Sequence, residues 1–118
     1  MDIGSDITLG ALEYALNGLA QRGDVRANNM ANANTPGFQA SKVSFEGALE
    51  DALRSGDISG VSSPSTTIKP GLPDGQGNTV SMEDEMIEGI KDNLGFQTYI
   101  QGYNFKLDVL RKAIGGQG

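Results

Sequence analysis

A long apolar repeat near the C-terminus constrains the fold more than any other feature of the sequence. It keeps strict steps of four and three across 33 residues, the spacing of a helix face that stays on one partner. Its members are Met82, Met86, Gly89, Asn93, Phe96, Ile100, Tyr103, Leu107, Leu110 and Ile114. Ser81 is placed to cap the start, and an acidic first turn suits a helix N-terminus. We therefore predict that residues 81–118 form a C-terminal helix, which ends near Gly115 and is roughly 50 Å long.

A second helix is predicted within residues 1–34, from about residue 5 to residue 32. Leucines at positions 9, 12, 16 and 19 share one stripe of it, and Met30 continues that stripe beyond Gly23 and Arg26. Pro36 and Gly37 then suit the two central positions of a type II turn. The helix is therefore expected to end by about residue 34.

Residues 35–80 are predicted to contain the turn, a short helix and an extended connector. Phe45, Leu49 and Leu53 recur every four residues, with Ser44 as the expected N-cap. Residues 55–79 then hold five Ser, five Gly and three Pro, which is typical of a connector. The predicted fold is all-α, with the long N-terminal and C-terminal helices paired as a coiled-coil-like hairpin and a loop-rich middle segment.

Composition excludes several classes of function. The net charge of −6 argues against a nucleic-acid partner, and the absence of histidine and cysteine removes the usual nucleophile pairs and transition-metal ligands. No long apolar run predicts direct membrane insertion, and the first residues lack the pattern of a cleavable signal. The acidic residues at positions 83, 84, 85 and 88 suit a solvated helix start better than a cation site. We therefore expect no enzyme activity, cofactor or metal.

The two helices carry features that predict assembly with other chains. A pair of helices cannot enclose a core, so Ile87, Ile90, Leu94 and Val109 would stay exposed in a monomer. Six helix glycines cost about 1 kcal/mol each relative to alanine, unless they allow close helix approach. They are Gly10, Gly18, Gly23, Gly89, Gly95 and Gly102. We expect helices that order fully only when neighbouring subunits cover them.

An asparagine-rich motif follows the first helix. Four of the seven residues from Asn28 to Asn34 are asparagine, which is unfavourable in a helix interior. Physical reasoning alone favours a fraying helix end followed by a turn. The motif consists of Ala27, Asn28, Asn29, Ala31, Asn32, Thr35, Pro36, Gly37 and Phe38.

These residues resemble the signature of the flagellar rod and hook axial family, A-N-N-x-A-N-x-x-T-P-G followed by Phe or Tyr. Every fixed position is matched. Residues 78–86 and 99–114 are similar to the start and body of that family's C-terminal helix. The short length and residues 39–45 resemble the proximal rod proteins within it. The helix glycines and a connector that is short for the family depart from the pattern.

The resemblance implies a structural subunit of the bacterial flagellar basal-body rod, the hollow shaft that transmits torque. It implies that the terminal helices form the inner layer of the rod. Its implied partners are copies of itself, other rod proteins, ring or adaptor proteins at the rod base, and the flagellar type III export apparatus. It also implies export without a cleaved signal peptide and assembly in the periplasm.

Two sets of residues are predicted to carry this function. The first set packs the helix pair and its neighbours: Leu9, Leu12, Leu16, Leu19, Met30, Phe96, Ile100, Tyr103, Leu107 and Leu110. The second set, Asn28, Asn29, Asn32, Thr35 and Pro36, is expected to stabilise the turn and contacts between subunits. A soluble secreted helical-hairpin module or export adaptor remains an alternative, which the motif does not support, and an enzyme is a third hypothesis.

Overall fold

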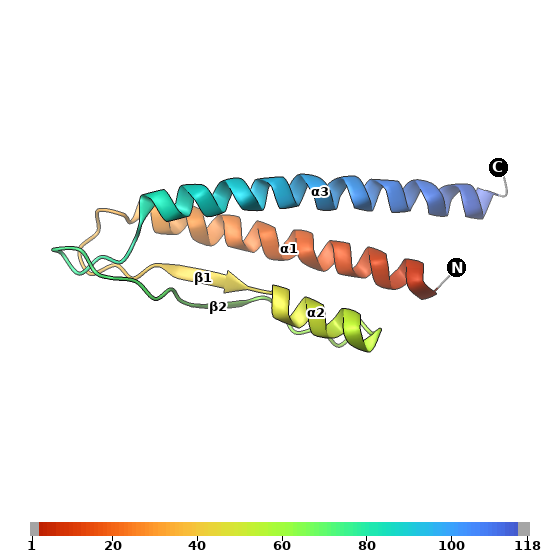
Figure 1. The fold of residues 1–118 in the computed structure, drawn as a ribbon, viewed down its shortest axis with the longest axis horizontal. Helices are drawn as coiled ribbons and strands as arrows, with labels where there is room; N and C mark the ends of the chain where they lie inside the picture. Colours follow the sequence, from red (N-terminus) through yellow and green to blue (C-terminus); the bar gives the residue numbers. More distant parts are fainter. Residues whose placement is uncertain (1–2, 116–118) are drawn as a thin grey trace.

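Three layers lie side by side along one axis in the computed structural model, which describes residues 3–115 (Figure 1). Helix α1 (Ile3–Ala31) is the middle layer, and helix α3 (Met82–Gly115) covers one side of it. Strands β1 (Ser41–Ser44) and β2 (Ser65–Ile68), with helix α2 (Glu46–Ser55), cover the other side. The molecule measures 64 × 25 × 15 Å, so its long helices determine its shape.

The expected all-α fold is wrong, because the middle segment contains a small antiparallel sheet. Ser41 pairs with Ile68 and Ser44 pairs with Ser65. Part of the predicted connector is therefore a strand. Each strand has only four residues, and all of β2 is exposed, so neither carries the alternation of apolar residues that identifies a strand in sequence.

Helix α2 begins later than its predicted cap. Ser44 is the last residue of β1, and Phe45 occupies the N-cap position without a side-chain cap hydrogen bond. The Phe45 ring is buried, so the start of α2 is anchored by packing rather than by a hydroxyl. The predicted end is confirmed, since Gly56 has the left-handed φ of 79° that glycine tolerates and donates to the Ala52 carbonyl.

The turn after α1 matches its prediction. The Phe38 N–H donates to the Thr35 carbonyl over 3.2 Å, which closes a four-residue turn around Pro36 and Gly37. Gly37 has a φ of +75°, as the third position of a type II turn requires.

Helix α3 begins as predicted, and its contact with α1 is formed around glycines. The Asp84 N–H donates to the Ser81 hydroxyl over 3.3 Å, which is the expected N-cap bond. A Cβ placed at Gly102 would lie 3.8 Å from a Leu12 methyl, and one at Gly95 would lie 3.9 Å from a Leu19 methyl. These contacts run in opposite directions along the two helices, so α1 and α3 are antiparallel.

The repeat on α3 faces α1 only in part. Its first residues, Met82 and Met86, are 42% and 57% exposed, and its last, Ile114, is 76% exposed. Gly95 and Gly102, which lie off the repeat, make the close approach instead. The side of α3 that contacts α1 is therefore rotated away from the predicted seam.

The buried core lies between α1 and the middle segment. It consists of Ala15, Leu19, Val43 and Phe45, with Tyr14, Val25, Leu49 and Tyr99 packed around it. The Phe45 ring meets the Tyr14 ring edge-on at 6.1 Å. The Arg22 guanidinium lies 4.7 Å from the centre of the same ring, within reach of a cation–π contact. Phe45 therefore joins β1 and α2 to the middle of α1.

We expect Gly18→Ala to destabilise the protein by about 1–3 kcal/mol. A Cβ at Gly18 would lie 2.5 Å from the buried Phe45 ring, so the ring must move. Gly23 is the matched control, because nothing lies within 4 Å of its added Cβ. Gly23→Ala should stabilise the same helix by about 0.5–1 kcal/mol. Urea unfolding measures both, and equal shifts of the two variants would contradict the close contact.

Candidate functional site

The asparagine-rich motif joins α1 to β1 through one buried side chain. Asn29 is 2% exposed, and its amide bonds the backbone of Ser41 twice. Its Nδ2 donates to the Ser41 carbonyl over 2.8 Å, and the Ser41 N–H donates to its Oδ1 over 3.0 Å. The side chain thus takes the place that a neighbouring strand would have at this edge of β1.

Arg22 completes the same edge two residues further along β1. Its Nε and Nη2 donate to the Val43 carbonyl over 3.1 and 2.9 Å. Backbone groups alternate in direction along a strand, so Ser41 and Val43 face α1 while the residues between them face β2. Side chains of α1 therefore determine where β1 lies along the helix.

Asn78 closes the other side of the motif. It is 1% exposed, and its Nδ2 donates to three carbonyls at the end of α1, those of Asn32, Ala33 and Thr35, over 2.8–3.0 Å. The last carbonyls of a helix have no partner within the helix, so this amide acts as a cap from a distant part of the chain. The motif therefore depends on residue 78 for its own order.

The other motif residues lie closer to the surface. Asn32 donates to the Asn28 carbonyl over 2.8 Å and accepts from the Thr35 hydroxyl over 3.0 Å. Phe38 is half-buried, and its carbonyl accepts from the Thr79 N–H. Exposed members of the motif are Ala27, Asn28, Ala31, Thr35, Pro36 and Gly37.

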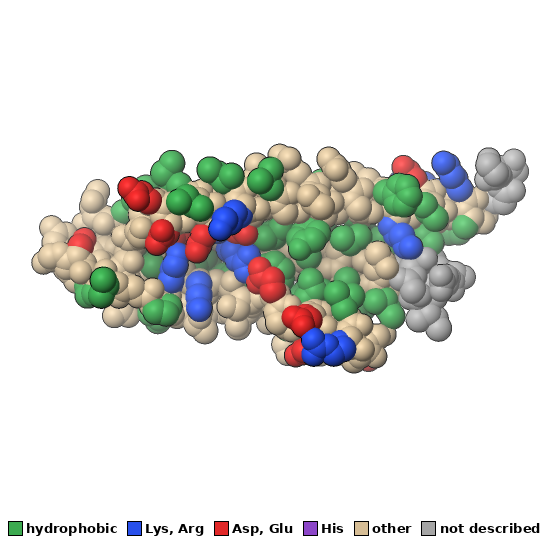
Figure 2. All heavy atoms as spheres, viewed as in Figure 1, with side chains coloured by type: hydrophobic (Ala, Val, Ile, Leu, Met, Phe, Trp, Pro, Cys, Tyr) green, Lys and Arg blue, Asp and Glu red, His purple; other side chains and the backbone are tan. Residues whose placement is uncertain are grey.

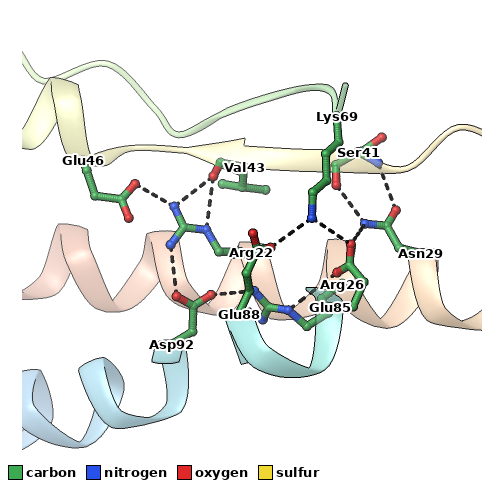
Figure 3. Close-up of polar contacts among 10 residues, drawn as sticks. All are labelled: Arg22, Arg26, Asn29, Ser41, Val43, Glu46, Lys69, Glu85, Glu88 and Asp92. Carbon is green, nitrogen blue, oxygen red and sulfur yellow. Dashed lines mark hydrogen bonds and ion pairs between the residues drawn. The ribbon is translucent and has the colours of Figure 1, made fainter. Parts of the chain in front are cut away.

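Beside the motif, an ionic cluster brings the three layers together (Figure 3). Arg22 bridges Glu46 at 2.6 Å and Asp92 at 3.2 Å, and Arg26 contacts the second oxygen of Asp92 at 2.7 Å. Lys69, which follows β2, contacts Glu88 at 3.0 Å. The ionic cluster consists of Arg22, Arg26, Glu46, Lys69, Glu85, Glu88 and Asp92.

Glu85 is the buried member of the ionic cluster. It is 3% exposed and receives the Asn29 amide at 3.2 Å and the Lys69 ammonium at 3.4 Å. Its second oxygen lies 3.7 Å from the Arg26 Nε, an ion pair without a hydrogen bond. A buried carboxylate needs such partners, because an unpaired charge is very costly to bury.

The ionic cluster shifts the pKa values of its members. Burial alone would lower the pKa of Lys69, but the hydrogen bond to Glu88 and the charge of Glu85 outweigh it and raise the pKa. Burial opposes the same result at Arg22, where Glu46 and Asp92 raise the pKa. Burial alone would raise the pKa of Glu46, but its hydrogen bond from Arg22 lowers it. The three shifts keep these charges paired at neutral pH.

The geometry of this site suits a structural role. Its enclosed hollow, lined by residues that include Arg22, Arg26, Asn29 and Lys69, holds a cavity volume of about 40 Å³. A site for a small molecule is typically roughly ten times larger. Within residues 3–115, no group of three acidic side chains is placed to hold a metal ion. No helix in that range is both long and apolar enough to cross a membrane.

The structure brings only some of the predicted packing residues together. Leu12 and Leu19 meet α3 at Gly102 and Gly95, and the Tyr103 hydroxyl donates to Glu13 over 3.1 Å. Met30 lines an open groove with residues of the first turns of α3. Phe96 is 40% exposed. Half-buried members of the set are Leu9, Leu16, Ile100, Leu107 and Leu110.

Sequence reasoning missed Asn78 and the ionic cluster. Their bonds join residues up to 70 positions apart, so no local spacing reveals them. One signal was present: Arg22 and Arg26 are one turn apart on α1, and Glu85 and Asp92 lie two turns apart on α3. In an antiparallel helix pair, these opposite charges meet.

Comparison with known proteins gives this site its context. Residues 10–39 match the family model described as flagella basal body rod protein, and this match includes the whole asparagine-rich motif. The flagellar basal body rod protein FlgB of Aeromonas hydrophila is 35% identical over 99% of both chains. FlgB of Bacillus subtilis (strain 168) is 29% identical over 92% of this chain and 94% of its own. FlgB of Escherichia coli (strain K12) is 31% identical over 78% of this chain and 81% of its own.

The chain therefore belongs to the family of flagellar basal body rod proteins. Its relatives across this range of bacteria are FlgB proteins, as the resemblance of the motif had indicated. It is a structural subunit of the proximal rod of the flagellar basal body.

We expect Asn29→Ala to destabilise the protein by about 2–4 kcal/mol. The change leaves the Ser41 N–H and carbonyl, and one oxygen of Glu85, without their buried partner. Asn34→Ala is the control, because Asn34 is an exposed asparagine of the same segment and should change stability by less than about 0.5 kcal/mol. Chemical unfolding of both variants tests the assignment, which equal losses would refute.

We also expect the contribution of Glu46 to stability to disappear in acid. Its pKa is lowered in the folded protein, so the contribution is present above the unfolded carboxyl pKa of about 4.3 and is lost as the pH falls toward the folded value. Its side chain is 62% exposed, so solvent screening limits the effect to about 0.5–1 kcal/mol. The stability difference between wild type and Glu46→Gln, measured by urea unfolding from pH 7 downward, should shrink below that pKa. A difference independent of pH would contradict the ion pair with Arg22.

Proposed function

We propose that the chain builds the rod through its two long helices, with α1 and α3 in the inner layer of a hollow helical assembly and residues 35–80 reaching toward adjacent subunits. The elongated shape supports this arrangement, because both long helices run along the 64 Å axis. The motif and the ionic cluster then act within the subunit and hold the middle segment against the helix pair.

One observation carries the proposal: α3 is long but barely buried. Among its described residues, Glu85 alone is buried. Nine of the twelve large hydrophobic residues that are exposed in the described part of the chain lie on this helix. An apolar surface of this extent is typical of a contact site, so α3 needs neighbouring subunits to cover it.

The two halves of the helix pair are supported very differently. At the start of α3, the ionic cluster and Asn29 join three layers. Toward its end, the contacts with α1 include Leu12 against Gly102 and the Tyr103 hydroxyl on Glu13. We expect this thinly packed half to order fully on assembly, as in the predicted coiled-coil-like hairpin.

The partners and location follow from the rod role as further parts of the proposal. The chain assembles with copies of itself, other rod proteins and ring or adaptor proteins at the rod base. It travels through the flagellar type III export apparatus without a cleaved signal peptide and assembles in the periplasm. Exposed motif residues, Asn28, Thr35 and Pro36 among them, are available for contacts between subunits. The role requires no catalysis.

We expect Leu107→Asp, expressed as the sole copy of the protein, to abolish rods and swimming. Leu107 is half-buried in the isolated chain, and a neighbouring subunit that completes its burial would leave an unpaired carboxylate in the contact. Asn104→Asp introduces the same charge at an exposed position of α3 and should leave assembly intact.

Soft-agar motility and electron microscopy of isolated basal bodies measure the outcome. Circular dichroism of both purified variants checks that the chains have comparable helix content before assembly. Normal rods built from Leu107→Asp would refute this packing surface.

A further inference from the structure

A second apolar surface runs along the side of α3 that faces away from α1. It consists of Ile87, Ile90, Leu94, Phe105 and Val109, which are 53%, 63%, 59%, 70% and 42% exposed. Ile87 and Phe105 are 18 residues apart, which is five turns of a straight helix, so they point the same way. We call this surface the outer stripe. Figure 2 shows hydrophobic side chains along the α3 edge, near its start and again toward its end.

The outer stripe is large enough to be a contact site. At these exposures its five side chains present on the order of 500 Å² of surface, a size that on monomers often marks an interaction site. Two such surfaces packed together, with their polar rims, approach the roughly 800 Å² per partner of a stable interface. No residue exposed on α1 or α2 offers a comparable surface: of the large hydrophobic residues in the described parts of those helices, only Leu53 is exposed.

Charges along the outer stripe select its partner and its direction. Glu83 lies one turn before Ile87, and Lys112 lies one turn after Val109. Inside these ends, Lys91 follows Ile87 by four residues, and Asp108 follows Phe105 by three. All four charged residues are exposed, and Asp108 contacts Arg111 at 3.5 Å within its own helix. The stripe is therefore acidic at its start and basic at its end.

An antiparallel copy of α3 matches this pattern about Thr98. Ile87 and Val109 are equally distant from Thr98 in sequence, and so are Lys91 and Phe105, so each would face the other across a two-fold axis. Glu83 would then meet Lys112, and Lys91 would lie within one turn of Asp108. A parallel copy in register would instead set Glu83 against Glu83 and Lys112 against Lys112, which is repulsive.

We infer that free chains pair in solution through their outer stripes, as an antiparallel two-fold dimer centred near Thr98. This dimer is a form of the protein outside the rod. A two-fold contact of one surface with itself is closed and cannot grow into a helical assembly. The dimer therefore covers the apolar surface of free chains and opens when a chain joins the rod.

Sedimentation equilibrium of the full chain across the micromolar range tests the pairing. We expect reversible dimers, with the dissociation constant of Leu94→Asp at least about tenfold higher, because the carboxylate would be buried without a partner. Leu53→Asp is the matched control, since Leu53 is a comparably exposed leucine on α2, and should pair like wild type. A wild-type monomer throughout the range, or equal dissociation constants for the two variants, would overturn the inference.

Disulfide mapping tests the direction, and the absence of natural cysteine makes it clean. Thr98→Cys should form a covalent dimer rapidly on oxidation, because the axis brings the two copies of this position together. Asn104→Cys is the control: Asn104 is exposed on the same helix but away from the axis, and its two copies would lie roughly 18 Å apart along the helices. Equal or faster cross-linking of Asn104→Cys would overturn the antiparallel arrangement.

Discussion

The burial of Glu85 is the constraint on which the rest of the structure depends. A carboxylate so far from water needs compensating partners, and this one takes them from separate parts of the chain. Asn29 and Arg26 come from α1, and Lys69 comes from the segment that follows β2. Because hydrogen bonds are directional, these partners determine the position of each layer along the others, which apolar packing alone would leave free to slide.

A polar anchor of this kind suits a subunit with a small core. The buried hydrophobic cluster is formed by α1, β1 and Phe45, and α3 contributes no buried apolar residue to it in the part of the chain described. The ionic cluster and the two buried asparagines therefore hold one end of the molecule, while the rest of α3 keeps its apolar side chains on the surface. A rod subunit has a use for this division, because the surface that the monomer leaves open is available to its neighbours.

Local patterns predicted the parts of the fold that local physics controls. The long helices, the Ser81 cap and the turn at Pro36 and Gly37 follow from periodicity, capping and backbone sterics within a few residues. The family motif was also visible, because it lies in one short segment. The two strands were missed, since β1 exists where α1 supplies hydrogen bonds to Ser41 and Val43. Ser44 was mistaken for a helix cap for the same reason.

The sequence by itself determined that the chain has two long amphipathic helices, a turn between them and the signature of the rod family. Only the tertiary structure decided which face of α3 meets α1, and which charges share a buried site. Periodicity defines a face but not its partner, so the glycine contacts at Gly95 and Gly102 replaced the expected seam. The pairing of Arg22 with Asp92 joins residues 70 positions apart, and its energy exists only after the chain has folded the two together.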